Sequence, residues 1–139
     1  MKIFLTLIAF INLILFACSD DDNQLIYDYH AHIEQPAATS YQLGDSLKIQ
    51  INFESHTGET VHHINVRITN KATGIEVYSK PTNEHVDDPS GSFEFTDHIL
   101  LNATNGFSAN SSWVLEAKVW GHEDGIEEVT SKIEFTIKP

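Results

Sequence analysis

Alternation of apolar and polar residues is the feature that most limits what this chain can fold into. It is cleanest over residues 46–55, where polar side chains separate Leu47, Ile49, Ile51 and Phe53. Successive side chains of a β-strand point to opposite faces of its sheet, so this stretch predicts a strand with one apolar face. After the N-terminal segment, no stretch shows the 3.6-residue period of an amphipathic helix. We therefore expect the folded part of the chain to be all-β.

Seven stretches carry this alternation, and together they predict a small sandwich of two sheets. The predicted strands are residues 26–34, 46–55, 61–69, 75–80, 92–101, 112–121 and 126–138. Seven short strands with one apolar face each are typical of an immunoglobulin-like β-sandwich, and another small all-β sandwich or barrel is the alternative. No linker or repeat divides residues 26–139, so we assign them to one domain. Its predicted core includes Ile49, Ile51, Phe53, Ile64, Val66, Ile68, Phe93, Phe95, Leu115, Val119, Ile133 and Phe135.

The first residues predict a signal peptide. Residues 1–17 form an apolar run that is too short for a stable membrane anchor, and the run leads directly into Cys18, the single cysteine of the chain. The sequence Leu15-Phe16-Ala17-Cys18 resembles the bacterial lipobox. This resemblance implies that residues 1–17 are removed and that Cys18 carries acyl chains such as palmitate. An ordinary secretory signal followed by a chance cysteine is the alternative.

The next residues predict where such a lipoprotein is found. Ser19 and the acidic residues 20–22 lie within residues 18–25, a segment that resembles the acidic Ser-Asp-rich tether of Bacteroidota surface lipoproteins. Adjacent carboxylates repel one another and nothing apolar is available to bury, so the tether should stay extended. The resemblance implies an outer-membrane lipoprotein exposed at the cell surface, and a spacer on a periplasm-facing lipoprotein is the alternative.

Charge and motifs exclude several functions. The chain has 8 Lys and Arg against 20 Asp and Glu, which gives a formal net charge of -12. Nucleic acids and anionic membranes are bound through clustered Lys and Arg, so we expect no nucleic-acid partner and no membrane contact except through the lipid on Cys18. The sequence lacks Gly-x-Ser-x-Gly, His-Glu-x-x-His and a phosphate-binding glycine loop. We therefore expect a protein that is not an enzyme.

The chain holds 8 histidines, and strand direction predicts where they gather. If successive strands alternate in direction, one end of the sandwich collects His56, His62, His63, His85 and His122, with His30 close by. His32 lies farther along the first strand, and His98 lies in the other half. The same end receives the carboxylates of Glu54, Glu59, Asp87, Asp88, Glu123 and Asp124.

Imidazoles beside carboxylates are natural ligands of zinc and copper. The predicted metal site uses His30, His122 and either His62 or His63, with His56 or His32 supplementary. His30 and His32, two residues apart, share one strand face and can share an ion. A solvated histidine-rich surface and a pH-sensitive contact in an interface are the alternatives.

A local resemblance also points to metal. The segments His30-Ala31-His32-Ile33 and Gln35-Pro36-Ala37, with a later strand ending Phe53-Glu54, are similar to the start of the small periplasmic copper-carrier sandwiches. In that family the first histidine is the mature N-terminus and its amine is a ligand. Here His30 lies 12 residues after Cys18, so that ligand is missing.

One modification site and two function classes complete the predictions. Asp45-Ser46-Leu47 resembles the O-glycosylation pattern of Bacteroidota, with Ser46 as acceptor, although an Asp-Ser turn also explains it. The first function class is a lipid-anchored module of the cell envelope that binds a divalent transition metal. The alternative is an accessory domain without metal that contacts a protein or glycan partner through its loops.

Overall fold

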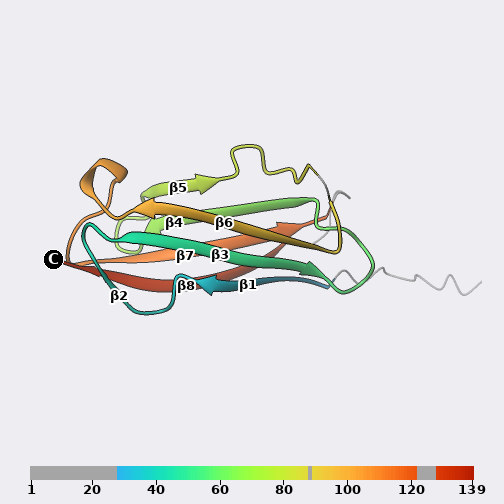
Figure 1. Cartoon of the computed structure of the whole chain (residues 1–139), viewed down its shortest axis with the longest axis horizontal. Coiled ribbons are helices and arrows are strands. Elements are labelled where there is room, and N and C mark those ends of the chain that lie inside the picture. Colours follow the sequence, from blue (N-terminus) through green and yellow to red (C-terminus); the bar gives the residue numbers. More distant parts are fainter. Residues whose placement is uncertain (1–27, 88, 122–127) are drawn as a thin grey trace, which may run out of the picture.

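The computed structural model describes residues 28–87, 89–121 and 128–139, and it shows two β-sheets packed face to face (Figure 1). The strands are β1 (Tyr29–Gln35), β2 (Ser40–Gln42), β3 (Ser46–Ser55), β4 (His63–Asn70), β5 (Glu76–Lys80), β6 (Ser92–Leu100), β7 (Ser111–Trp120) and β8 (Val129–Lys138). One sheet has the order β1-β3-β6 and the other has the order β2-β8-β7-β4-β5. These two sheets confirm the predicted immunoglobulin-like β-sandwich. A short 3-10 helix, η1 (Ala103–Asn105), follows β6, and no helix in the described ranges is long and apolar enough to cross a membrane.

β1 corresponds to the first predicted strand, and a short additional strand, β2, follows it in the other sheet. β1 pairs antiparallel with β3, whereas β2 pairs in parallel with β8. Pro36 separates β1 from β2, and a proline nitrogen cannot donate to a sheet ladder. β2 is an eighth strand that the sequence analysis did not predict, because three residues are too few to show alternation. Residues 26–27 and 126–127, which were also assigned to strands, lie outside the described residues.

The predicted core is largely correct. Nine of the twelve predicted residues are buried, whereas Phe93, Phe95 and Ile133 are partly buried and pack against that core. Phe93 and Phe95 stay partly exposed because β6 is an edge strand with a partner on one side only. The core also takes in four residues that were not in the predicted core and that lie in connections between the observed strands: Val61, Val86, Leu101 and Phe107.

Asp97 links the edges of the two sheets. Its Oδ2 accepts hydrogen bonds from the Tyr78 hydroxyl and from Lys80 Nζ, each at 2.8 Å, and both donors belong to β5 of the other sheet. The backbone N–H of His98 donates to Oδ1. Burial raises the pKa of Asp97, but the hydrogen bonds from Lys80, the His98 amide and Tyr78 together lower it below its usual range. Burial and the bond to Asp97 raise the pKa of Tyr78, so its hydroxyl remains a donor.

Replacing Asp97 by asparagine is expected to lower the free energy of unfolding by about 1–2 kcal/mol at pH 7, because a charged hydrogen-bond acceptor is lost. A carboxyl group whose pKa is lower in the folded chain stabilises the fold fully above its unfolded pKa, about 3.9. That contribution disappears as the pH falls through the lower folded pKa. The difference between Asp97→Asn and the wild type should therefore shrink below about pH 4.

Denaturant unfolding followed by circular dichroism at pH 7 and at pH 3 measures this difference. Glu94→Gln is the matched control, since Glu94 is exposed on the same strand, and its effect should stay within about 0.5 kcal/mol. An Asp97→Asn loss no larger than that of the control would show that Asp97 does not hold the sheet edges together.

Candidate metal-binding site

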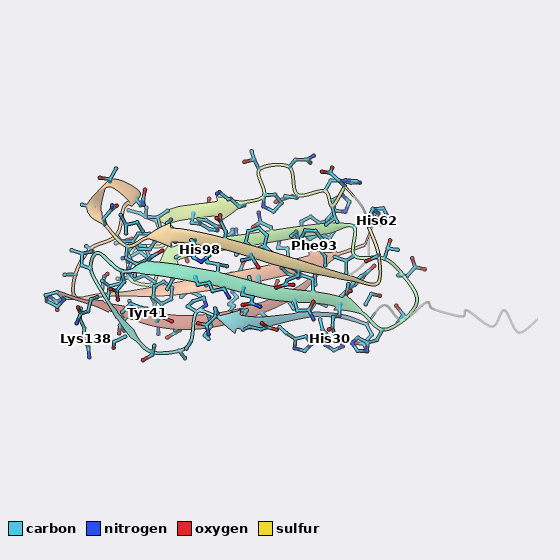
Figure 2. All side chains as sticks on the ribbon, in the orientation of Figure 1. His30, Tyr41, His62, Phe93, His98 and Lys138 are labelled. Atoms are coloured by element: carbon cyan, nitrogen blue, oxygen red, sulfur yellow. The ribbon has the colours of Figure 1, made fainter. Side chains whose placement is uncertain are left out.

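Most of the histidines lie toward one end of the sandwich, where β1 and β4 begin and β3 and β7 end (Figure 2). Apart from the parallel pair of β2 and β8, paired strands are antiparallel, which agrees with the alternating strand directions from which the gathering of the histidines was predicted. His98 lies away from this end, on β6 opposite Lys48. The histidines toward this end are His30, His32, His56, His62, His63 and His85.

The first histidine group consists of His30, His32 and His56 and lies on the outer face of the three-stranded sheet. His30 and His32 alternate with the buried Tyr29 and Ala31 along β1, so both imidazoles point away from the core. The rings of His30 and His32 stack with centroids 5.8 Å apart, and His56 meets His30 edge-on at 4.8 Å. The three side chains are 41%, 58% and 55% exposed, so a solute can reach them.

Two carboxylates complete this patch. Glu54 Oε2 lies 3.2 Å from His56 Nε2 and 3.7 Å from His32 Nε2. Asp28 Oδ1 lies 2.8 Å from His30 Nε2. The backbone N–H of His56 donates to the Asp28 carbonyl at 3.0 Å and holds the start of β1 beside the end of β3. Each imidazole of the first group therefore has a carboxylate oxygen close to one ring nitrogen.

The second histidine group consists of His62, His63 and His85 and lies where β4 of the five-stranded sheet begins. The ring centroids are 6.1 Å apart for His62 and His63, 5.7 Å for His62 and His85, and 5.4 Å for His63 and His85. His63 also stacks on Trp120, its cross-strand partner in β7, with centroids 5.2 Å apart and planes 11° apart. Since the next residue, Ile64, is buried, His63 and Trp120 lie on the outer face of this sheet.

The structure does not bring the two groups together. His30 and His62 lie apart at the same end (Figure 2), because the first group is carried by the three-stranded sheet and the second by the five-stranded sheet. The predicted combination of His30 with His62 or His63 is therefore not formed. Strand direction decides the end at which a residue lies, but sheet membership decides its face. His122, the third predicted ligand, lies outside the described residues.

Neither group is already arranged around an ion. Across residues 28–87, 89–121 and 128–139, no three His, Cys, Asp or Glu side chains are placed so that they could hold a metal as they stand. In the first group each imidazole faces a carboxylate, and in the second the rings face one another. Metal binding would therefore need imidazoles to turn about their side-chain bonds, a motion that is fast for exposed side chains such as those of the first group.

The remaining predicted site residues are placed as follows. Ser46 begins β3 with an exposed side chain, and the Asp45 carboxylate just before it accepts from the Gln42 backbone N–H at 2.8 Å. The backbone N–H of Asp45 also donates to the Gln42 carbonyl at 3.1 Å and closes a four-residue turn, so this geometry also fits the turn interpretation. The carboxylates of Glu59 and Asp87 belong to connections beside β4. Four predicted residues lie outside the described ranges, namely Cys18, Asp88, Glu123 and Asp124.

The sequence analysis missed two features of the second group. His85 was placed at this end but was not among the predicted ligands. An isolated bridge pairs His85 with His63 and fixes its position. The sequence analysis also assigned no role to Trp120, although the alternation in β7 puts this residue on the face opposite the core. Cross-strand register, which the sequence does not show, makes Trp120 the neighbour of His63.

Comparison with known sequences identifies no relatives, since no family model and no curated protein matches this chain. Solved structures are similar in fold. The CARDB domain from Pyrococcus furiosus, in its solution structure, is 11% identical with a TM-score of 0.54, covering 81% of this chain and 96% of that one. The crystal structure of the same domain in complex with di-metal ions is 12% identical with a TM-score of 0.50, covering 80% and 88%.

CopC from Methylosinus trichosporium OB3b is also among the structural neighbours. It is 14% identical with a TM-score of 0.41, covering 79% of this chain and 95% of that one. A TM-score of 0.41 is too low for this likeness to support any argument about the predicted copper-carrier resemblance. The lipobox, the tether and a Bacteroidota source are not tested by these comparisons and stay predictions. At these identities the likeness concerns the fold alone, and this chain has the β-sandwich fold that the CARDB domain also has.

Proposed function

We propose that this chain is a lipid-anchored, non-catalytic binding module of the cell envelope that takes up a divalent transition metal, zinc or copper, at the first histidine group. The observation that carries the proposal is that His32 and His56 both approach one oxygen of Glu54. Ligand atoms around a tetrahedral zinc lie about 3.3 Å apart, because each bond is about 2.0–2.1 Å long. The Nε2–Oε2 separations of 3.2 and 3.7 Å are close to that spacing.

His30 supplies a third nitrogen. Its ring centroid lies 5.8 Å from that of His32 and 4.8 Å from that of His56. Three imidazoles on one zinc have centroids roughly 5–5.5 Å apart, given the same bond length. An ion can therefore replace the carboxylate contacts of these rings with only side-chain movement, because the backbone already sets the rings at a suitable spacing.

Charge favours a cation at this patch. The whole chain carries a formal net charge of -12, and the carboxylates of Asp28 and Glu54 are within the patch itself. A negative surface raises the local concentration of cations and speeds their association. The carboxylates assist in this way whether or not they bind the ion directly.

Titration calorimetry of the purified mature chain with Zn²⁺ and with Cu²⁺ tests the proposal. We expect a Kd on the order of micromolar or tighter at pH 7.5. The double variant His30→Ala/His32→Ala should weaken binding at the first group at least about tenfold, since two nitrogen ligands are lost. Binding should also fall below about pH 6, because a metal displaces protons from its imidazole ligands.

His98→Ala is the matched control, because His98 belongs to neither group and its loss should leave binding unchanged. Binding weaker than about millimolar by the wild type would overturn the proposal. Equal binding by the wild type and the double variant would also overturn it for this patch. The accessory domain that contacts a protein or glycan partner would then be the better interpretation.

A further inference from the structure

The second histidine group is held in place by backbone hydrogen bonds on both sides. The N–H of Val86 donates to the His62 carbonyl at 2.7 Å, and the N–H of Ile64 donates to the Glu84 carbonyl at 2.9 Å. Val86 and Ile64 are themselves buried in the core. The segment that carries His85 is therefore fixed against the start of β4, and the three imidazoles do not depend on a loose loop for their proximity.

Ring spacing in this group fits a shared ion. The three centroid separations are 5.4, 5.7 and 6.1 Å. Three imidazoles bound to one zinc have centroids roughly 5–5.5 Å apart. The rings meet at interplanar angles of 84°, 63° and 36°, and the group does not hold a metal as it stands, so the rings of His62 and His85 must turn about their side-chain bonds to bind one. The backbone needs little adjustment, because the separations are already close to those of a bound set.

One ring is prepared as a ligand by its surroundings. Nδ1 of His63 lies 3.0 Å from the Gly121 carbonyl oxygen, and a carbonyl can only accept, so this nitrogen carries the proton. In the neutral imidazole, Nε2 is then the nitrogen that carries the lone pair. A metal-binding histidine is commonly oriented in this way, with its other ring nitrogen donating to a backbone carbonyl. Stacking on Trp120 fixes the plane of the same ring.

We propose that His62, His63 and His85 bind a second divalent transition ion, Zn²⁺ or Cu²⁺, independently of the first histidine group. The two groups share no residue and lie on different sheets, so this site goes beyond the proposed function and can exist without it. Three nitrogen ligands leave a fourth position of a tetrahedral ion open to water or to an outside ligand. The wild type is then expected to bind two ions per chain.

Copper quenching of tryptophan fluorescence distinguishes the two sites. Trp120 stacks on His63, so Cu²⁺ at the second site should quench its emission, whereas Zn²⁺, which is d¹⁰ and redox-inactive, should not. Trp113 is buried seven residues earlier in β7, roughly 23 Å along the strand, and should be little affected. Cu²⁺ titration of the mature chain, with ion stoichiometry from calorimetry, provides both readouts.

The variants are His85→Gln for the second site and His30→Gln/His32→Gln for the first. His85 is exposed, so His85→Gln should keep the melting temperature of the wild type, and His62→Gln provides a second test of the same site. We expect His85→Gln to lose one equivalent of ion and the Cu²⁺ quenching of Trp120, and the first-group variant to lose one equivalent but retain the quenching. His98→Gln, the matched control, should change neither.

Each outcome distinguishes this inference from the proposed function. Full stoichiometry and full quenching in both His85→Gln and His62→Gln would overturn the second site. The second site would also be overturned if the wild type binds one ion per chain and only the His30→Gln/His32→Gln variant loses that ion. A single equivalent lost only in His85→Gln would support the second site and overturn metal binding at the first group.

Discussion

Replacing Phe53 by alanine is expected to lower the free energy of unfolding by about 3–5 kcal/mol. Its side chain is fully buried, and β3 is the central strand of the three-stranded sheet, so there is core on one face and a strand on each side. Phe53 lies between Ala31 in β1 and Phe93 in β6. Truncating it leaves a cavity that these neighbours, fixed by their ladders, can fill only in part. Denaturant unfolding followed by circular dichroism measures the loss.

Phe93→Ala is the matched control for that prediction. Phe93 is directly opposite Phe53, but it is on the edge strand and only partly buried, so its truncation should cost clearly less. A domain of this size has about 5–15 kcal/mol of stability, so Phe53→Ala should bring it close to unfolding at ambient temperature. An unchanged melting temperature in Phe53→Ala, or a larger loss in Phe93→Ala, would mean that the inward face of β3 has been assigned incorrectly.

Alternation predicted the fold where strands are long and one face is buried. Residues 46–55 were predicted as a strand with the bounds that the structure shows, because every second residue there is buried. It failed where the burial comes from something other than a strand face. Val86 and Phe107 are buried in connections, and β2 is too short to show a period. The sequence therefore predicts the long strands well, but it does not predict which residues of the connections are buried at the ends of the sandwich.

The sequence predicted the end of the sandwich at which the histidines lie, but not the sheet face on which each one lies. Strand direction placed His30 and His63 at the same end, and the structure agrees. It could not show that the two face outward from different sheets, because that depends on which strands pair. The neighbouring residues His62 and His63 show the same limit, since local sequence does not say that both rings contact His85. These contacts depend on which strands pair across the sheets, and the alternation pattern of a single sequence does not reveal that pairing.

If Cys18 is lipidated, the first histidine group lies near the membrane. Asp28, which lies directly before β1, is ten positions after Cys18, and an extended chain spans at most about 3.3–3.6 Å per residue. The start of β1 can then be no more than roughly 35 Å from the lipid. An ion at His30, His32 and His56 would be bound close to the membrane surface, and the second group at the same end would also be near it.

Replacing Cys18 by serine is expected to abolish incorporation of labelled palmitate into this protein, because the chain has no other cysteine to take a thioether-linked lipid and mature as a lipoprotein. The loss of membrane affinity should be large, since each buried methylene contributes about 0.8 kcal/mol and several acyl chains anchor a protein far more firmly than one. Ser19→Ala is the matched control and should keep full labelling. Mass spectrometry of the wild-type N-terminal peptide should find an acylated Cys18 and no residues 1–17. A free thiol at Cys18 with residues 1–17 retained, or labelling that persists in Cys18→Ser, would show that the lipoprotein prediction is wrong and would remove the reason for placing the histidines near a membrane.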